Sequence, residues 1–338
     1  MIITQTPVRV SFLGGGTDYP DYYMEHGGAT LATTIDKYTI VTVHPITQFL
    51  DYNIRVHYSK IEAVESLDEI EHPSARECLR FLGIQEGVEI HYVGDLPARS
   101  GLASSSSATV GLLHALHAYK NEKVSRAQLA DEAVHVEQVL IEERVGSQDQ
   151  FLCALGGFLH LKFEPNGEIH AEPVDISAER TNSLQDRLML LYTNQQRTAH
   201  DVLDEQVART VAGENDVGLA QLSDLVDRGI ALLTGQGEIS QFGTILHESW
   251  MVKRQLSSKI TTDRIDSLYQ RALEAGATGG KLLGAGGGGF LLLFVEPENR
   301  SCVRNALSEL PEAKFRFDSS GSVILRAVFL CAGGKQQQ

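Results

Sequence analysis

The chain has 338 residues, of which 42% are hydrophobic and 22% charged, and its formal charge at pH 7 is −15. This composition is ordinary for a globular protein and excludes disordered, collagen-like and coiled-coil chains. The negative charge disfavours nucleic acid and anionic membranes as partners, because each requires a basic binding face.

Neither the amino terminus nor the cysteine pattern indicates export. Residues 1–12 alternate like a strand and lack the basic segment and apolar run of a secretory signal. No apolar stretch approaches the length of a membrane span. The cysteines are scattered without a C-x-x-C pair, which fits neither a zinc site nor a disulfide framework, and they are Cys78, Cys153, Cys302 and Cys331. We expect a cytoplasmic protein.

In chain order, strand patterns come first and helical patterns follow. Alternating β-branched and aromatic residues predict strands at 8–13, 38–44, 54–58 and 88–93. Apolar positions three and four apart predict helices at 104–119 and 126–144, and strands are predicted again at 158–163 and 169–174.

The second half of the chain repeats this mixture of elements. A strand is predicted at 188–192, helical patterns continue to residue 276, and a strong strand follows at 290–295. A helix near 300–310 and strands near 314 and 323 complete the chain. We therefore expect an α+β protein with two domains, residues 1–178 and 186–332, joined by a linker at 177–185 and followed by a flexible polar tail at 333–338.

The segment from Asp95 to Ser107 carries the strongest local signal for chemistry. It runs from a strand into a helix through Pro97, Gly101 and four consecutive serines, 104–107. Small residues let the backbone approach a ligand, and a helix start offers free N–H groups to an anion. The alternative is a serine cap, but one cap needs only one serine. We interpret the segment as a phosphate cradle, although it is not a Walker loop.

A second glycine-rich segment, from Lys281 to Gly289, formally satisfies G-x-G-x-x-G. In a dinucleotide fold that pattern follows a strand and precedes a helix, whereas here a helical pattern precedes it and a strand follows. The nicotinamide interpretation is therefore weak. The alternative of a linker is disfavoured because a buried-looking strand follows directly.

Acidic residues near these loops are candidates for binding and catalysis. Asp18 follows the glycine turn 14–16, and Glu137 shares the apolar face of its helix. A buried carboxylate is costly unless it is paired or binds a metal, so Glu137 is a candidate metal ligand, with a salt bridge as the alternative. Asp149 begins another helical turn. His114 and His117, one turn apart without a neighbouring zinc pattern, are interpreted as structural or surface residues rather than metal ligands.

Taken in order, the segments 7–18, 97–107 and 281–289 and the acid pair Glu137 and Asp149 resemble the GHMP kinases. The resemblance covers nearly the whole chain. It implies a two-domain fold, with an amino-terminal domain like ribosomal protein S5 domain 2 and a carboxy-terminal ferredoxin-like domain, and the active site between them. It also implies a kinase that uses ATP and Mg²⁺.

Roles carried over from the family are expectations for the matching positions. Asp149 would accept the proton of the acceptor hydroxyl, and Arg9 would stabilise Asp149 and the transferring phosphoryl group. Ser105 and Glu137 would hold Mg²⁺, with Ser104 or Ser106 as alternatives to Ser105. The nucleotide would contact Pro97, Gly101, Leu102, Ala103, Ser104, Ser105, Ser106, Gly284, Gly286 and Gly287.

Within the family, the opening segment 7–20 is most similar to the D-glycero-D-manno-heptose 7-phosphate kinases, with fucokinases close by. The resemblance implies a sugar phosphate as acceptor, contacted by Gly15, Gly16, Thr17, Asp18 and Gly288. The far phosphate of such an acceptor needs a cation, for which Arg197 at the start of a predicted helix is the candidate, with a solvated arginine as the alternative. Galactokinases carry Glu-His at the positions of Gly15 and Gly16, which argues against galactose. A non-catalytic sensor of sugar and ATP is the alternative from another class, and a homodimer is the default assembly.

Overall fold

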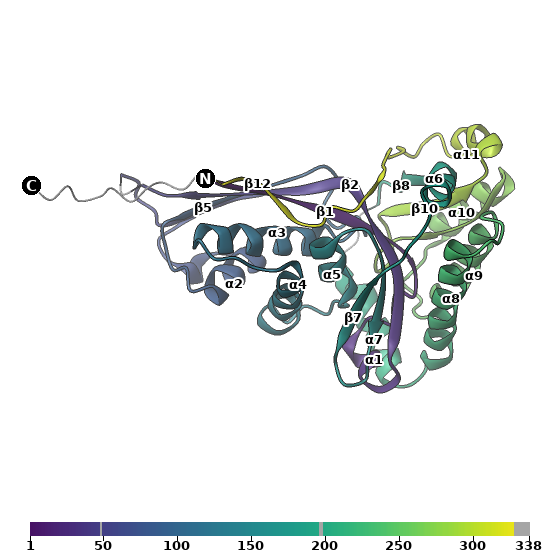
Figure 1. The fold of residues 1–338 in the computed structure, drawn as a ribbon, viewed down its shortest axis with the longest axis horizontal. Helices are drawn as coiled ribbons and strands as arrows, with labels where there is room; N and C mark the ends of the chain where they lie inside the picture. The colour runs from purple at the N-terminus through teal and green to yellow at the C-terminus, as the bar shows by residue number, and fades with distance from the viewer. Residues whose placement is uncertain (48, 196–198, 328–338) are drawn as a thin grey trace, which may run out of the picture.

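The computed structural model describes residues 1–47, 49–195 and 199–327 and contains two β-sheets (Figure 1). Nine strands of the described residues form the larger sheet, with the path β12-β1-β2-β5-β3-β4; β6 and β11 also pair with β2, and β7 pairs with β6. Their bounds are β1 (Ile2–Leu13), β2 (Gly28–Pro45), β3 (Ile54–His57), β4 (Ile61–Val64), β5 (Val88–Gly94), β6 (Phe158–Phe163), β7 (Ile169–Pro173), β11 (Phe317–Asp318) and β12 (Val323–Ala327).

Strands β1 and β2 are long and bend in the middle, as Figure 1 shows. Their antiparallel register shifts between Pro7 and Val8, where Pro7 faces Tyr38 and Val8 faces Ile35. Beyond the shift β2 pairs with β6, and before it β2 pairs with β5. Because of the bend, the β1–β2 hairpin contributes both to the part of the sheet that contains β5 and to the part that contains β6. Arg9 lies just past the bend on β1.

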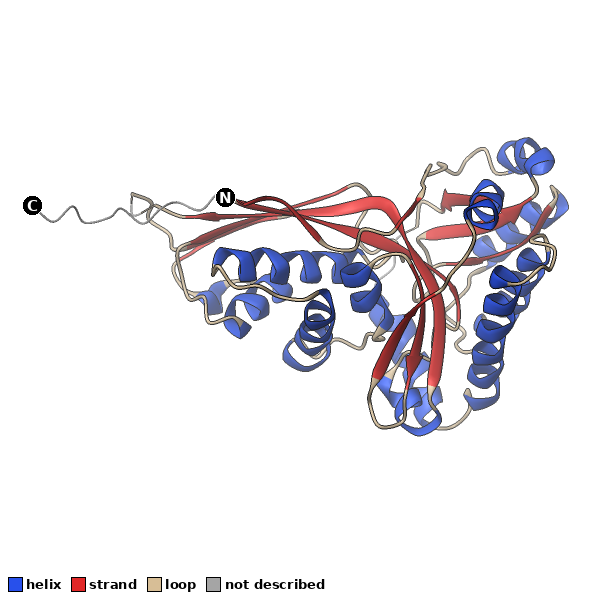
Figure 2. Ribbon diagram, viewed as in Figure 1, coloured by secondary structure: helices blue, strands red, loops and turns tan. Residues whose placement is uncertain are grey.

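Helices cover one face of the amino-terminal part of this sheet (Figure 2). They are α2 (Pro73–Phe81), α3 (Ser104–Tyr119), α4 (Arg126–His135), the π-helical turn η2 (Val136–Leu140) and α5 (Gln148–Leu155), and the short elements η1 (Leu67–Glu69) and α1 (Pro20–His26) lie between strands. Helix α3 has the predicted bounds. The helix predicted over 126–144 is too long, because its regular hydrogen bonds give way to η2 and end at residue 140.

The smaller sheet has the antiparallel order β8-β10-β9, with β8 (Leu188–Tyr192), β9 (Ala277–Leu282) and β10 (Phe290–Val295). All residues of β10 are buried, which explains its continuous apolar run. The remaining elements are α6 (Ala178–Arg187), α7 (Ala199–Val211), α8 (Asp216–Thr234), α9 (Gln241–Lys253), α10 (Asp263–Glu274), η3 (Pro297–Asn299) and α11 (Arg300–Ala306). The predicted α+β class is confirmed.

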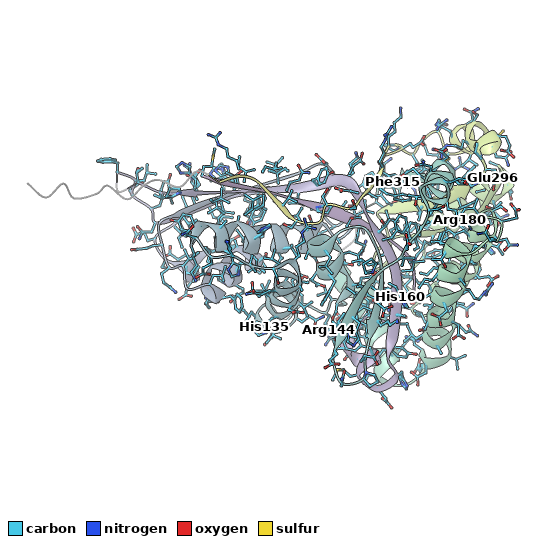
Figure 3. All side chains as sticks on the ribbon, viewed as in Figure 1. His135, Arg144, His160, Arg180, Glu296 and Phe315 are labelled. Carbon is cyan, nitrogen blue, oxygen red and sulfur yellow. The ribbon has the colours of Figure 1, made fainter. Side chains whose placement is uncertain are left out.

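Three sequence-based predictions about this half are wrong. The segment 177–185 is not a linker, because Ser177 caps helix α6 and Arg180 (Figure 3) donates to the backbone oxygens of Leu232 and Leu233 at the end of α8. A strand, β9, precedes the second glycine-rich segment, so that segment joins two antiparallel strands and still lacks the helix of a dinucleotide fingerprint.

The third correction concerns the domain boundary at residue 332. Strand β11 pairs with β2 and strand β12 pairs with β1, so the chain returns to the first sheet after the second is complete. The described part of the second half therefore does not form one contiguous domain. The predicted tail at 333–338 lies outside the described residues.

Candidate functional site

The centre of the candidate site is an ion pair between strand β1 and helix α5. Arg9 is 4% exposed, and its Nε and Nη2 each donate to an oxygen of Asp149 at 2.8 Å. Its Nη1 donates to the backbone oxygen of Gly101 at 2.7 Å. Bidentate pairing fixes both side chains, and the Asp149 side chain remains 25% exposed. A carboxylate is thereby held in place with one side open to a hydroxyl.

The two glycine-rich segments meet next to this pair. A Cβ at Gly101 would lie 2.4 Å from the oxygen of Leu283, and a Cβ at Gly284 would lie 2.5 Å from the Cα of Gly101. Both glycines have positive φ angles. The amide of Phe290 also donates to the oxygen of Ser100 at 3.1 Å. Only glycine permits such close backbone contact, so the predicted convergence of the two segments is confirmed.

A second carboxylate, Glu137, is buried beside the start of helix α3. It is 1% exposed, and its Oε2 accepts from Ser106 Oγ at 2.9 Å and from Gln150 Nε2 at 2.5 Å. Burial raises the pKa of Glu137 to about 7, against the opposing effect of its hydrogen-bond donors. Its other oxygen, Oε1, has no hydrogen-bond partner.

These residues fit a divalent cation of the magnesium type. The buried Oε1 of Glu137 and the buried Oγ of Ser104 both lack a protein partner, and an unsatisfied buried oxygen is costly. Carboxylate and hydroxyl oxygens are the ligands that Mg²⁺ prefers. Of the predicted serines, Ser106 contacts Glu137, whereas Ser105 is exposed on α3.

Asp18 lies in the same region but is bound only by neutral donors. It is 2% exposed, and its two oxygens accept from the amide of Gly16 and from Gln148 Nε2, each at 2.9 Å. Burial raises its pKa, and the charge of Asp149 raises it further. The turn is closed by Thr17 Oγ1, which donates to the backbone oxygen of Gly14 at 2.9 Å.

Three consecutive residues of helix α5 connect the three acids of the site: the middle one is an acid, Asp149, and its two neighbours bind the other acids. Gln148 donates to Asp18, Asp149 accepts from Arg9, and Gln150 donates to Glu137. The two glutamines were not among the sequence candidates. Their signal is a polar triplet at the start of an otherwise apolar helix, 148–155.

Two buried lysines of the site also had no predicted role. Lys253 is 7% exposed and donates to the oxygen of Gly284 at 2.7 Å, and Lys281 is 1% exposed and donates to the oxygen of Phe12 at 2.9 Å. Burial lowers the pKa of Lys253 to about 8, and it also lowers the pKa of Lys281 well below its usual value. The signal for Lys253 is its place three residues after the buried Trp250 on α9.

Other predicted site residues are placed at the edge of this arrangement. Gly286 packs against Ile260, and Gly288 packs against the backbone of Gln195. Gly287 donates to the oxygen of Ile260 at 2.8 Å, and Pro97 is exposed in the turn before Gly101. Arg197 lies outside the described residues.

The structural interpretation of the helix α3 histidines is confirmed. His117 lies between Glu122 and Glu132, at 3.1 and 2.7 Å, and His114 contacts Ser322 Oγ at 2.9 Å. The described cysteines Cys78, Cys153 and Cys302 are free, as expected.

A histidine pair, His57 and His91, lies with Glu89 on strands β3 and β5, close enough to share a metal ion. However, Arg55 donates to the Glu89 carboxylate at 2.5 Å, so the negative charge of Glu89 is already paired with a guanidinium.

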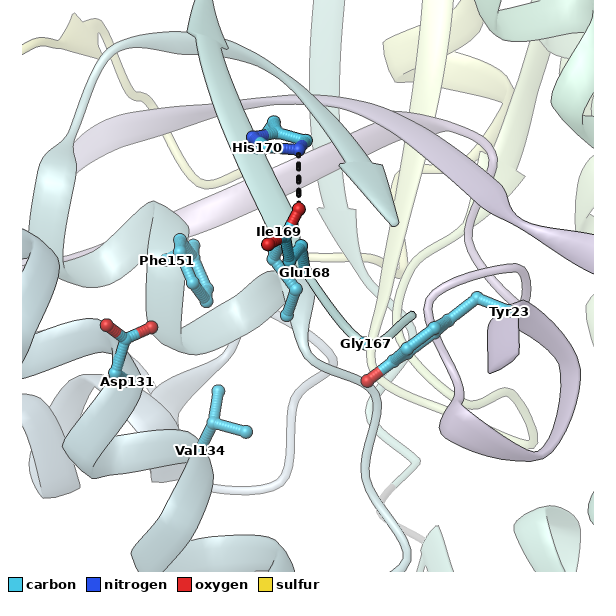
Figure 4. Close-up of a pocket in the computed structure, with 8 residues that line it drawn as sticks. All are labelled: Tyr23, Asp131, Val134, Phe151, Gly167, Glu168, Ile169 and His170. Atoms are coloured by element: carbon cyan, nitrogen blue, oxygen red, sulfur yellow. Dashed lines mark ion pairs between the residues drawn. The ribbon is translucent and has the colours of Figure 1, made fainter. Parts of the chain in front are cut away.

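A cavity of about 410 Å³ lies between α5, the end of α4 and the turn before β7 (Figure 4). Its lining includes the acids Asp131 and Glu168, with His170 facing Glu168 at 3.8 Å. None of its lining residues is among the predicted site residues. The lining thus carries two acids, and it shares no residue with the candidate site.

Two family models match the chain. The model of the GHMP kinases N terminal domain matches residues 68–157, and the GHMP kinases C terminal model matches residues 230–313. The first includes the serine segment, Glu137 and Asp149, and the second includes Lys253 and the glycine-rich hairpin loop. Within the part of the chain that the structure describes, no helix is long and apolar enough to span a bilayer.

Comparisons with individual proteins agree. The chain is 29% identical to D-glycero-alpha-D-manno-heptose 7-phosphate kinase of Campylobacter jejuni, over 90% of this chain and 93% of that protein. It is 27% identical to the bifunctional fucokinase/GDP-fucose pyrophosphorylase of Arabidopsis thaliana, over 91% of this chain and 31% of that protein. The crystal structure of a D-glycero-D-manno-heptose 1-phosphate kinase from Bacteroides thetaiotaomicron superimposes with a TM-score of 0.77, at 22% identity, over 97% of this chain and 100% of that one.

Proposed function

Since the chain belongs to the GHMP kinase family, a group of phosphotransferases with an alcohol group as acceptor, we propose that it phosphorylates D-glycero-D-manno-heptose 7-phosphate at the anomeric hydroxyl. The donor is ATP and the product is the 1,7-bisphosphate, a precursor of nucleotide-activated heptose for surface polysaccharide. The two sheets and their helices form the α+β fold of the family.

The observation that carries the catalytic assignment is the clamped Asp149 carboxylate. Arg9 fixes it from one side, and its open side can accept the proton of the acceptor hydroxyl. The hydroxyl oxygen then attacks the γ-phosphorus of ATP, and ADP leaves. Phosphoryl transfer asks mainly for positioning and charge stabilisation, so no covalent intermediate is required.

The nucleotide phosphates are assigned to the junction of the two glycine-rich segments. Gly101 and Gly284 are in contact there, and the first amides of helix α3 follow directly. Glu137 and Ser106 would hold Mg²⁺, with Ser104 as a further oxygen donor. When bound, Mg²⁺ neutralises charge on the β- and γ-phosphates.

Support for the heptose comes from the relative named above and from the glycine turn 14–16. A 29% identity is compatible with several acceptors, and L-fucose is the second candidate because the fucokinase relative also matches along the chain. A sensor without catalysis is disfavoured by the complete set of Arg9, Glu137 and Asp149. A cytoplasmic location and a homodimer remain predictions.

The deciding experiment is ADP release in parallel with heptose 7-phosphate, mannose, fucose, galactose and mevalonate. We expect the highest kcat/KM with heptose 7-phosphate, and phosphorus NMR of the product should show a new ester at the anomeric oxygen. Higher kcat/KM with fucose would replace the heptose by the second candidate. Turnover with none of the five, in protein that binds ATP, would favour the sensor.

A further inference from the structure

Three polar side chains surround one point above the backbone of Gly15. A methyl group added at Gly15 would lie 3.5 Å from Ser11 Oγ, 3.7 Å from Gln148 Nε2 and 3.8 Å from Lys253 Nζ. These are ordinary van der Waals distances, so a small group fits at this point in contact with all three atoms, and each of the three can donate a hydrogen bond. An anion oxygen would find three donors there.

The donors around this point are buried and incompletely used. Ser11 is 5% exposed and its Oγ has no hydrogen-bond partner. Lys253 is 7% exposed, and the one described bond of its ammonium, to Gly284, uses one of three protons. Gln148 Nε2 donates to Asp18 and retains a second proton. Buried donors without partners are costly unless a ligand satisfies them.

The charges around this point also favour an anion. Arg9 and Asp149 neutralise each other, and both oxygens of Asp18 are bonded to neutral donors. That leaves the buried amino groups of Lys253 and Lys281 with Asp18 as the remaining nearby carboxylate. An ammonium in low dielectric is expensive without a counter-charge, and a phosphate would supply one.

We propose that Lys253, Ser11 and Gln148 form a phosphate-binding subsite above Gly15. The inference rests on the proposed kinase reaction, in which two phosphate groups come close to Asp149. One is the γ-phosphate of ATP, reached through the contact of Lys253 with the glycine-rich loop at Gly284. The other is the phosphate ester of a phosphorylated acceptor, whose predicted contacts begin at Gly15.

The test measures binding by calorimetry in the whole protein for four ligands: AMPPNP, ADP, heptose 7-phosphate and unphosphorylated heptose. Lys253→Met removes the charge, and Gly15→Ala places a methyl group at the centre of the three side chains without steric conflict and at a position whose φ any residue adopts. Lys253→Arg retains the charge, and Lys259→Met, at an exposed lysine on the same segment, is the matched control.

We expect Lys253→Met and Gly15→Ala to lose about 10- to 100-fold in affinity for one phosphate ligand, as for a lost charged hydrogen bond. A loss for AMPPNP but not ADP assigns the subsite to the γ-phosphate. A loss for heptose 7-phosphate but not heptose assigns it to the acceptor. Lys253→Arg should retain part of the affinity, and Lys259→Met all of it.

Wild-type affinities for all four ligands in both Lys253→Met and Gly15→Ala would overturn the subsite. So would an equal loss for ADP and AMPPNP without any effect on heptose 7-phosphate, because such a loss does not depend on either phosphate group. Absence of heptose 7-phosphate binding to the wild-type protein would instead count against the proposed acceptor, while the AMPPNP and ADP comparison would still test the subsite. Unchanged thermal unfolding of Gly15→Ala verifies its fold.

Discussion

Asp149 and Glu137 each place a carboxylate beside the same glycine- and serine-rich segment, yet their environments differ. Asp149 has a guanidinium on both oxygens and remains a quarter exposed, whereas Glu137 is 1% exposed, accepts only from neutral donors and keeps one oxygen unpaired.

The difference assigns different chemistry to the two acids. The charge of Asp149 is compensated within the protein, so this carboxylate suits proton acceptance from a neutral hydroxyl. The charge of Glu137 lacks compensation, which is why burial raises its pKa to about 7, and a bound cation would remove the penalty. Both residues are carboxylic acids, so their different roles follow from their neighbours: a guanidinium beside Asp149 and only neutral donors beside Glu137.

The largest expected effect follows replacement of the clamped acid. Asp149→Asn should lower kcat by about 10²- to 10⁴-fold, the usual contribution of a positioned general base, while ATP affinity is retained. Steady-state kinetics and calorimetry with ATP measure the two quantities. Asp204→Asn, at an exposed acid paired with Arg144, is the control and should leave kcat unchanged. Wild-type turnover in Asp149→Asn would remove the base role.

Glu137→Gln tests the other half of the comparison. Glutamine retains the size and one acceptor oxygen but not the charge, so we expect the Mg²⁺ concentration for half-maximal activity to rise about 10- to 100-fold. A magnesium titration of the kinase reaction gives this value. Glu168→Gln, which alters an exposed carboxylate, should titrate like the wild type. An unchanged titration in Glu137→Gln would make that acid purely structural.

The pH dependence tests Lys253, the buried cation near Asp149. Lys253 is faced by Asp18 and Asp149, which raise its pKa, and by Arg9, which lowers it, but burial dominates and brings the pKa to about 8. Its charge is therefore present below pH 8 and lost above it. We expect kcat/KM to fall about fivefold between pH 8 and 9, and Lys253→Arg to lack this limb because arginine stays protonated. The same alkaline limb in Lys253→Arg would assign it to another group.

The smallest effect, on the free energy of unfolding, is expected at an exposed ion pair that we compare with the pair of Arg9 and Asp149. Arg228 and Glu248 approach to 2.6 Å at the surface, with side chains 54% and 40% exposed. Arg228→Met should change the free energy of unfolding by less than about 1 kcal/mol in urea denaturation. Arg9→Met should cost more, because it leaves Asp149 and the oxygen of Gly101 without their donor. The reverse order would show that the buried pair contributes function without stability.

Local pattern predicted several elements with the observed bounds. Helix 104–119 and the strands 188–192 and 290–295 each carry an unambiguous apolar period or run. Strand β9 was missed because its sequence, Ala-Thr-Gly-Gly-Lys-Leu, has poor strand propensity. Gly279 in this strand is required by tertiary packing, because a Cβ there would lie 1.9 Å from the backbone oxygen of Gly243 in α9. Strand β9 forms because it pairs with β10 and packs against α9.

By itself the sequence determined the types of most elements, the two glycine-rich segments and the acids Asp149 and Glu137, since each depends on neighbours within a few positions. The pairing of Arg9 with Asp149 was implied by the family resemblance, and only the tertiary structure decided which serine contacts Glu137 and which backbone oxygens the buried lysines bind. Arg9 and Asp149 are 140 positions apart, and Lys281 and Phe12 are 269 apart. Charge compensation between such distant residues depends on the bend of β1 and β2 and on the packing of both sheets, which no local period encodes.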